Sequence, residues 1–294
     1  LSFFELLTLR ALMHFERARL DYMVIEVGLG GKLDATNILN YDLSLITSIG
    51  LDHMKQLGNT LESIAENKLG ILKPGNHLIT TVDPALHGMF LSYAKDVRAT
   101  IRLLDLNAVK KTRDHPLAFT YHGLDYELNL TGSYQLKNAI LALEAITYLN
   151  PETRYQALFQ GLKKTTWRGR MERVSDHIYV DGAHNTHAIL ALKETVLDAF
   201  RGMRVTVIYS ALGDKDISGM LEIIRSFADE LILTTFPDPR FLPLSDFIRQ
   251  GDRVIEDPKL AYQDAKANRQ ADEIILITGS LHFIGYMLST VIQN

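Results

Sequence analysis

The first part of the chain alternates between short apolar runs and amphipathic segments. Apolar residues at helical spacing predict a helix over residues 6–17. Residues 21–27 (DYMVIEV) and 43–49 (LSLITSI) are apolar runs of strand length, which predict two buried strands. Residues 59–70 begin at a capping asparagine and end at a glycine, which is typical of a helix. This order of elements predicts a βαβ unit with a mostly parallel sheet.

The pattern changes after about residue 101. Alternation of apolar and polar residues around Gly123 predicts an antiparallel hairpin at the edge of the sheet. An Ala- and Leu-rich stretch then predicts a helix over residues 135–148.

The second part of the chain returns to an α/β rhythm and predicts a doubly wound, Rossmann-like sheet. The expected strands are residues 177–180, 204–209, 230–235 and 273–278, and the expected helices are residues 186–200, 217–227 and 259–268. We therefore predict the α/β class with two domains, residues 1–166 and 167–294, which meet near residues 167–171.

Composition narrows the class of protein. The chain has 294 residues, 47% of them hydrophobic and 22% charged, which is ordinary for a soluble globular protein and argues against disorder. A net charge of −4 without a long basic run gives no sign of nucleic acid or an anionic membrane as partner. The absence of cysteine excludes disulfides, thiolate metal sites and cysteine nucleophiles, and fits a reducing cytoplasm. The longest apolar runs are strand-sized and too short to cross a membrane.

Polar residues at strand ends are the candidate site residues, because ligands of open α/β sheets bind beyond the carboxyl ends of the strands. Glu26 ends the first predicted strand, and Gly28, Gly30 and Gly31 follow it. Such a turn lets a ligand approach the backbone. A tight turn beside a solvated glutamate explains the same string when it is considered alone.

Two further candidates follow the second predicted strand. Asp52 and His53 come directly after it and could share a divalent ion, although magnesium prefers oxygen ligands and a histidine in a loop more often caps or packs. Lys68 lies in the last turn of the next predicted helix, where a lysine is usually only a favourable charge beside the helix dipole.

The second part of the chain holds a mixed acidic and basic group at one edge of its predicted sheet. Such a group is more informative than any single member, because unrelated surface residues have no reason to gather there. Its members are Arg170, Asp181, His184, Asn185, Asp214, Lys215, Ser280 and His282.

Taken together, these strings resemble folylpolyglutamate synthase and dihydrofolate synthase, which belong to the Mur ligase superfamily. EVGLGGKLDATN and ITSIGLDHMKQLGNTLESIAENKLGILK resemble two signatures of the central domain. GRME, DGAHN, YSALGDKDI and ITGSLHF resemble strings of the carboxy-terminal domain, in the same order. The two central signatures are long and specific, so they outweigh the simpler explanations given above for Glu26, His53 and Lys68.

The resemblance implies a set of metal ligands. Glu26 and His53 would help bind Mg²⁺, and Lys68 would carry the carbamate found in many relatives and help hold a second magnesium ion. Carbamylation needs a neutral amine, which partial burial of a lysine favours. His53, Lys68 and His184 would be the catalytic residues.

The resemblance also implies a nucleotide site and a substrate site. Arg170 and Asp181 would contact ATP, and Gln135 and Asn138, from the string GSYQLKNA, would help set the nucleotide site. The incoming glutamate or the phosphates would meet a second set: His184, Ser280, Asp214 and Lys215.

The implied reaction joins L-glutamate to a folate or dihydropteroate carboxylate. ATP phosphorylates the carboxylate, and the glutamate amino group then displaces phosphate from the acyl phosphate. The family suggests a cytoplasmic monomer that acts on small molecules.

The printed sequence departs from the family at one point. Relatives carry a P-loop, G-x-x-x-x-G-K-[ST], whose backbone N–H groups cradle the phosphates. No such string occurs here, and the first residue is Leu1. We therefore expect that the N-terminus is incomplete and that the chain as given turns over little. A natural short homologue that takes its phosphate site from another chain is the alternative.

Two rival functions remain open at this point. A ligase of the same superfamily could join an amino acid to a cell-wall precursor. The same fold could also serve as a non-catalytic binding module. The retention of six candidate residues speaks against that: Glu26, His53, Lys68, Arg170, Asp181 and His184.

Overall fold

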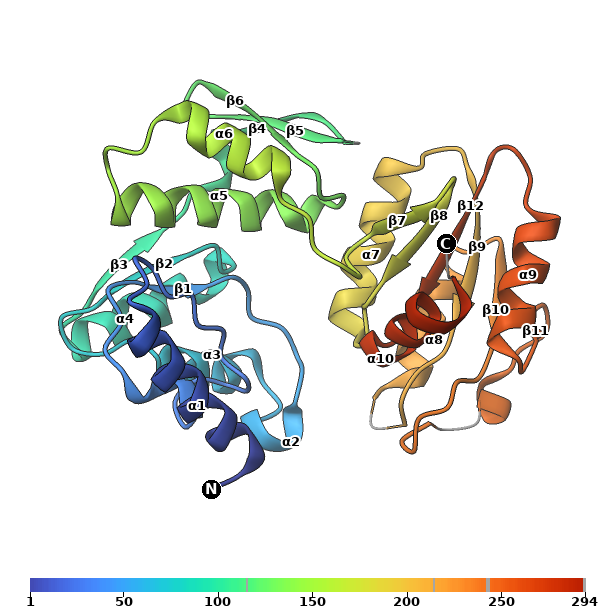
Figure 1. Cartoon of the computed structure of the whole chain (residues 1–294), viewed down its shortest axis with the longest axis horizontal. Coiled ribbons are helices and arrows are strands. Elements are labelled where there is room, and N and C mark those ends of the chain that lie inside the picture. Colours follow the sequence, from blue (N-terminus) through green and yellow to red (C-terminus); the bar gives the residue numbers. More distant parts are fainter. Residues whose placement is uncertain (115, 214, 242–243, 293–294) are drawn as a thin grey trace. The chain divides into compact units, whose positions relative to one another are not determined.

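The computed structural model describes residues 1–114, 116–213, 215–241 and 244–292 (Figure 1). It divides into two compact units. The first unit consists of Leu1–Leu106 and Ile140–Thr153, and the second of Asn107–Ala139 and Arg154–Asn294. The domain boundary at residues 166 and 167 stays a prediction.

The first unit contains a parallel three-stranded sheet in the order β1-β2-β3 (Figure 1). Its strands are β1 (Ser44–Ile46), β2 (His77–Thr80) and β3 (Thr100–Leu103). Its helices are α1 (Phe3–Ala18), α2 (Met54–Leu57), α3 (Leu61–Leu69) and α4 (His87–Asp96), with the short helices η1 (Ala35–Ile38) and η2 (Pro84–Leu86).

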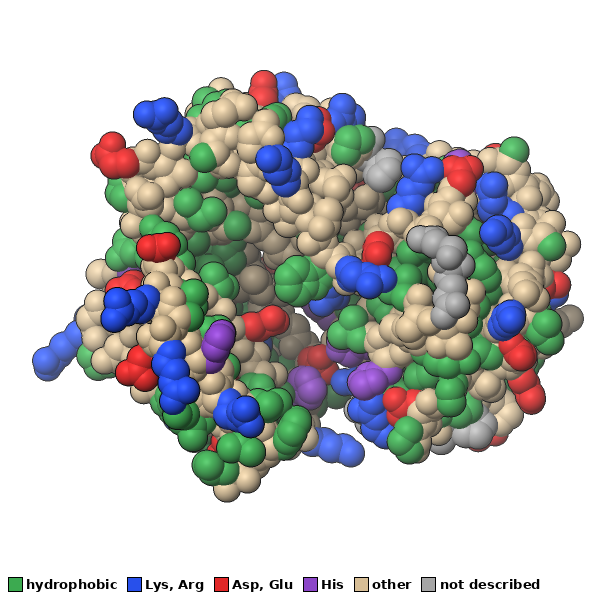
Figure 2. Space-filling view, viewed as in Figure 1, with side chains coloured by type: hydrophobic (Ala, Val, Ile, Leu, Met, Phe, Trp, Pro, Cys, Tyr) green, Lys and Arg blue, Asp and Glu red, His purple; other side chains and the backbone are tan. Residues whose placement is uncertain are grey.

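The core of the first unit is formed where α3 and α4 meet the sheet. One buried cluster joins Leu69 of α3, Leu78 of β2 and Phe90 of α4. Helix α1 contributes no buried residue, and Figure 2 shows apolar side chains at the surface of this unit. The predicted helices at residues 6–17 and 59–70 are both confirmed, as α1 and α3, although Thr60 and not the predicted Asn59 caps α3.

The strand predicted at residues 21–27 is wrong. These residues form no strand and pair with none of the residues that the structure describes, and the Val24 side chain is 95% exposed. A strand is stabilised by a hydrogen-bonded neighbour, and an apolar run without one remains irregular. The strand predicted at residues 43–49 is confirmed but shortened to β1.

The second unit contains an antiparallel sheet in the order β4-β5-β6. Its strands are β4 (Val109–Arg113), β5 (Leu117–Tyr121) and β6 (Leu124–Leu128). Gly123, with φ of 75°, makes the predicted hairpin turn between β5 and β6. The predicted place at the edge of the parallel sheet is wrong, because β5 pairs with β4 and β6 in a sheet of their own. Helix α6 (Tyr155–Lys164) packs on this sheet through Tyr155, whose ring lies 5.5 Å from that of Tyr126. Helix α5 (Ser133–Leu149) confirms the predicted helix at residues 135–148.

The larger sheet of the second unit has the order β11-β10-β9-β12-β8-β7. Its strands are β7 (Glu172–Ser175), β8 (Ile178–Asp181), β9 (Arg204–Tyr209), β10 (Glu230–Leu233), β11 (Arg253–Val254) and β12 (Glu273–Thr278). All neighbours pair in parallel except β7, which pairs antiparallel with β8 at the edge. Every residue of β12 is buried, as expected of a central parallel strand covered on both faces.

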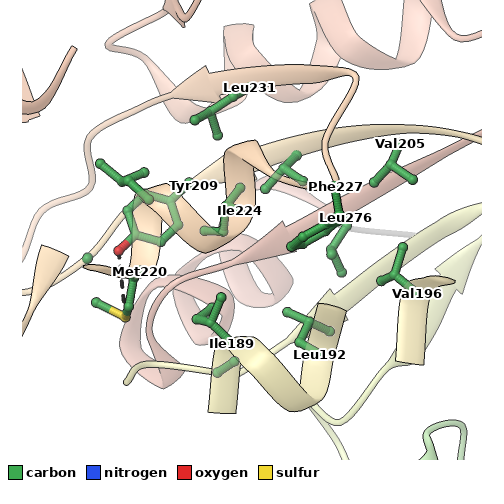
Figure 3. Close-up of a cluster of buried hydrophobic side chains, with 14 of the residues drawn as sticks. Ile189, Leu192, Val196, Val205, Tyr209, Met220, Ile224, Phe227, Leu231 and Leu276 are labelled. Carbon is green, nitrogen blue, oxygen red and sulfur yellow. Dashed lines mark hydrogen bonds between the residues drawn. The ribbon is translucent and has the colours of Figure 1, made fainter. Parts of the chain in front are cut away.

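Helices cover both faces of this sheet, which confirms the predicted doubly wound arrangement. One face packs against α7 (Thr186–Ala199) and α8 (Ile217–Arg225) in a core that includes Tyr209 and Leu276 (Figure 3). The other face packs against α9 (Pro258–Asn268) and α10 (Leu281–Tyr286). The short elements are η3 (Leu106–Ala108), η4 (Leu244–Phe247) and η5 (Met287–Val291). Within the described residues, no helix combines the length and the apolar character that crossing a membrane requires.

Candidate functional site

The glycine loop, which we define as residues 28–34, is fastened to the C-terminal end of α3. The Lys32 amide donates to the Asn67 carbonyl oxygen at 2.8 Å. Just beyond the loop, Asn37 Nδ2 donates to the Gly70 carbonyl oxygen at 2.9 Å. These bonds use carbonyl groups that a helix end leaves without an intrahelical partner. The loop that follows Glu26 is therefore held against the turn that carries Lys68.

Glycine is required in this loop for close packing. A Cβ atom on Gly31 would lie 2.9 Å from the Asn67 carbonyl oxygen, and one on Gly30 would lie 2.8 Å from Leu57 Cδ2. Real Cβ atoms do not approach backbone oxygens so closely, so a larger residue would push the loop away from α2 and α3.

Asp34 shapes the same loop from its far end. Its carboxylate accepts from the Leu29 amide at 2.8 Å, and from the Thr36 amide at 2.9 Å and hydroxyl at 2.6 Å. Burial alone would raise the pKa of Asp34, but these hydrogen bonds to the charged form outweigh it and lower the pKa. Sequence reasoning missed Asp34, although an aspartate two residues before a threonine in a turn is a recognisable local cap.

The three predicted metal ligands lie on segments that meet around α3. Glu26 is exposed, in the irregular segment before the glycine loop. His53 precedes α2 with φ of 50°, and its amide donates to Asp52 Oδ1 at 2.8 Å. Lys68 is half-buried in the last turn of α3.

The kinds of donor group in the first unit are suitable for a divalent metal ion. A carboxylate and an imidazole are present, and the exposure of Glu26 leaves room for the waters that Mg²⁺ retains. Among the described residues, no cluster of three His, Asp or Glu side chains could hold an ion alone. A site here therefore needs the modified Lys68 or substrate oxygens, and the metal roles stay predictions.

In the second unit, Asp181 ends β8 with its side chain turned inward. It is 3% exposed, and its oxygens accept from the amides of Met171 and Ala183, both at 2.9 Å. Burial raises the pKa of Asp181, against the lowering effect of these two bonds and of Arg170 and His184. This carboxylate therefore fixes the turns around it.

Tyr134, in the first turn of α5, joins the predicted nucleotide residues to this carboxylate. Burial raises the pKa of its phenol, the negative charge of Asp181 raises it further, and the charge of Arg170 opposes both. Its phenol interacts electrostatically with the side chains of Asp181 and Gln135. Gln135 is 5% exposed and accepts from Asn138 Nδ2 at 3.0 Å. The structure thus brings Arg170, Asp181, Gln135 and Asn138 into one neighbourhood, with Tyr134 as the link that sequence reasoning missed.

The predicted substrate residues of the second unit occupy cap and loop positions. His184 is half-buried, and its Nδ1 lies 2.9 Å from the Gly182 carbonyl oxygen. The Ser280 hydroxyl is buried and accepts from the His282 amide at 3.1 Å, which caps α10. Lys215 is half-buried in the loop before α8. Asp214 lies outside the described residues.

Two buried hydroxyls lie at the carboxyl edge of the large sheet. Thr278 is level with Asp181 on β8 and with Tyr209 on β9. Thr278 Oγ1 and Ser210 Oγ have no hydrogen-bond partner within the part of the chain that the structure describes. Unpaired buried polar atoms are uncommon, and here they coincide with the edge at which α/β sheets bind ligands.

Comparison with known proteins identifies the family. Two family models match: "Mur ligase middle domain" over residues 2–146 and "Mur ligase, glutamate ligase domain" over residues 169–281. The dihydrofolate synthase/folylpolyglutamate synthase of Bacillus subtilis is 34% identical over 96% of this chain and 70% of that protein. The Escherichia coli enzyme of the same name is 31% identical over 99% of this chain and 70% of that protein. The chain belongs to the dihydrofolate synthase/folylpolyglutamate synthase family.

Solved structures of family members share the fold. E. coli FolC in complex with ADP aligns with a TM-score of 0.87 and 30% identity, over 98% of this chain and 71% of that chain. A bifunctional enzyme from Yersinia pestis, complexed with AMPPNP and a Mn ion, aligns with a TM-score of 0.85 and 30% identity. The predicted family, fold class and ATP-dependent ligase class are therefore confirmed, while the individual site residues stay predictions.

Proposed function

We propose that this family member ligates L-glutamate to the carboxylate of a folate or dihydropteroate at the expense of ATP. The family match across 96% of the chain carries the proposal. Further support comes from ligands in relatives: FolC was solved with DHPP and ADP, and the Yersinia enzyme with Mn, AMPPNP and L-glutamate. We infer that it acts in the cytoplasm, which the lack of cysteine supports. We also infer that it acts as a monomer.

In this proposal the metal residues come from the first unit. Glu26, His53 and a carbamylated Lys68 would hold Mg²⁺, which would neutralise charge on the transferring phosphoryl group. Carbon dioxide would add to the neutral Lys68 amine, with loss of one proton, to give the carbamate anion.

The nucleotide and amino-acid residues come from the second unit. Arg170, Gln135 and Asn138 would contact ATP. Asp181 would act indirectly, because its two oxygens are engaged by Met171 and Ala183 and it is 3% exposed. A further set of residues would bind glutamate and phosphate through charge or hydrogen bonds: His184, Ser280, Lys215 and Asp214.

The reaction proceeds in two balanced steps. A carboxylate oxygen of the pterin substrate attacks the γ-phosphorus of ATP, the bond to ADP breaks, and an acyl phosphate forms. The neutral amino nitrogen of glutamate then attacks the acyl carbon and loses one proton, and phosphate leaves from the tetrahedral intermediate as the amide forms. Exclusion of water at this stage protects the acyl phosphate from hydrolysis.

A single-turnover experiment tests the proposal. The full chain, in excess over ATP, is mixed with Mg²⁺, L-glutamate and either dihydropteroate or tetrahydrofolate, and products are detected by mass spectrometry. We expect a glutamylated product that requires ATP and is lost in Lys68→Ala. Product from a nucleotide-linked muropeptide instead of a pterin, or equal product from Lys68→Ala and the parent chain, would overturn the proposal.

A further inference from the structure

Asn67 lies where three segments of the first unit meet. Its side-chain Nδ2 donates to the carbonyl oxygen of Leu57, the last residue of α2, at 3.3 Å. The same nitrogen donates to the Ser63 carbonyl oxygen in the preceding turn of α3, at 3.0 Å. Its own carbonyl oxygen accepts from the Lys32 amide of the glycine loop at 2.8 Å. One residue thus connects the glycine loop, α2 and α3.

The Asn67 carbonyl is available because α3 tightens at its end. The Ile71 amide, which would bond to Asn67 in a continuing α-helix, instead donates to the Lys68 carbonyl oxygen at 3.2 Å. The carbonyl that this leaves unpaired is taken by the glycine loop, and Gly31 allows the approach. The bond between the Lys32 amide and the Asn67 carbonyl oxygen therefore depends both on the tight end of α3 and on glycine at position 31.

The chemistry of the side chain requires an amide. Nδ2 carries two hydrogens and both are donated to carbonyl oxygens. An aspartate has the same shape, but it would place a carboxylate oxygen against the carbonyl oxygens of Leu57 and Ser63. That arrangement has no donor and two repulsive contacts, so α2 would separate from α3.

We propose that Asn67 is the positioning residue of the metal site. It fixes the glycine loop after Glu26 and the helix after His53 against the turn that carries Lys68. In this way it sets the spacing of the three donor groups without touching the ion. The inference rests on the proposed function, because it takes Glu26, His53 and Lys68 as the ligands.

The test measures Mn²⁺ binding to the full chain by electron paramagnetic resonance, with bicarbonate present so that Lys68 can be carbamylated. We expect Asn67→Asp to weaken Mn²⁺ binding by about tenfold or more, as when groups that orient metal ligands are removed. Asn268→Asp is the matched control: it makes the same change at an exposed residue that ends α9, and should bind Mn²⁺ as the parent chain does.

A second variant attacks the same junction from the loop. Gly31→Ala places a Cβ atom 2.9 Å from the Asn67 carbonyl oxygen and should also weaken Mn²⁺ binding, with Asn67 intact. If Asn67→Asp and Gly31→Ala disrupt the same junction, their effects should not add. The double variant should then bind Mn²⁺ about as weakly as whichever single variant binds it less well. Hydrogen exchange at the Lys32 amide should accelerate in both single variants. Circular dichroism identifies any variant that fails to fold, and the other variant then decides the outcome.

The outcomes separate the two proposals. If the parent chain binds no Mn²⁺, the metal site of the proposed function fails and this inference fails with it. If the parent chain binds Mn²⁺ and the folded variants bind it equally well, the positioning role of Asn67 is wrong and the proposed function stands. Fully additive losses in the double variant would also contradict a shared junction.

Discussion

At the scale of single residues, the described structure separates groups that can meet a ligand from groups that hold them. Glu26 and His53 are exposed, whereas Asp181 is enclosed by backbone amides and by the phenol of Tyr134. Met171 donates one of these amides from a backbone with φ of 43°, which is unusual for a residue other than glycine. The carboxylate therefore stabilises a turn that costs energy to form.

The Tyr134 phenol should contribute measurably to this arrangement. Tyr134→Phe removes the hydroxyl that interacts with the buried Asp181 carboxylate. The free energy of unfolding should fall by about 1.5–3 kcal/mol, the range for a hydrogen bond to a charged group. Urea denaturation measures the change. Tyr155→Phe is the control, because its phenol donates at 2.5 Å to the exposed Asp125 carbonyl oxygen and should contribute only about 0.5–1.5 kcal/mol. Equal losses would show that Asp181 does not depend on Tyr134.

At the scale of elements, the later part of α5 belongs to the first unit and contacts β2 and β3 of that unit through polar groups. Glu144 is 5% exposed and pairs with Arg102 of β3 at 2.6 Å. The Tyr148 ring stacks on His77 of β2 at 4.4 Å, and His77 Nδ1 lies 2.6 Å from the Thr100 hydroxyl. A buried carboxylate and a covered imidazole make this attachment sensitive to charge.

The stability of the first unit should therefore depend on pH through His77. Burial lowers the pKa of His77, and the positive charge of Arg102 lowers it further. The unfolded chain then binds a proton more readily than the folded one just below the ordinary histidine value of about 6.5. Stability is full above that value and declines as the pH falls towards the folded pKa.

Urea titrations at two pH values test this dependence. The parent chain should lose stability between about pH 7.5 and pH 5.5, and His77→Phe, which keeps the ring stacking, should lose less. His122→Phe changes an exposed histidine of the second unit and should leave the dependence as in the parent chain. A pH dependence that is the same in His77→Phe would assign it to other groups.

At the scale of the whole molecule, the described residues build two cores of different character. The second unit encloses a sheet whose central strand β12 is buried along its whole length. The first unit has a smaller buried cluster around α3, α4 and β2, and its helix α1 buries no residue. Local stability follows buried apolar contact, so it should differ widely along the chain.

Native-state hydrogen exchange should reveal this gradient. Amides of β8, β9 and β12 should exchange most slowly, through global opening of the second unit. Amides of α1 should exchange fastest among the helices, because none of its residues is buried among the described residues. Protection of α1 equal to that of β12 would mean that α1 is stabilised by contacts outside the described structure.

Much of the fold followed from the sequence because its signals are local. Helical spacing and caps predicted α1, α3, α7 and α8, and continuous apolar runs predicted β8, β9, β10 and β12. The same signal failed at residues 21–27, because an apolar run does not specify whether another strand lies beside it. The α/β class and the family were thus readable from pattern and motif.

The support of the candidate site was decided only by tertiary structure. Asn67 and Tyr134 lie inside quoted family strings, but nothing local indicates their partners Lys32 and Asp181, which lie far from them in the sequence. Likewise, the sequence could place Asp181 at a strand end but could not show that its carboxylate points inward. Periodicity and capping are properties of neighbouring residues, so the sequence alone determined the elements and the candidate ligands. Hydrogen bonds between distant segments exist only after folding, so the structure alone decided which residues hold those ligands in position.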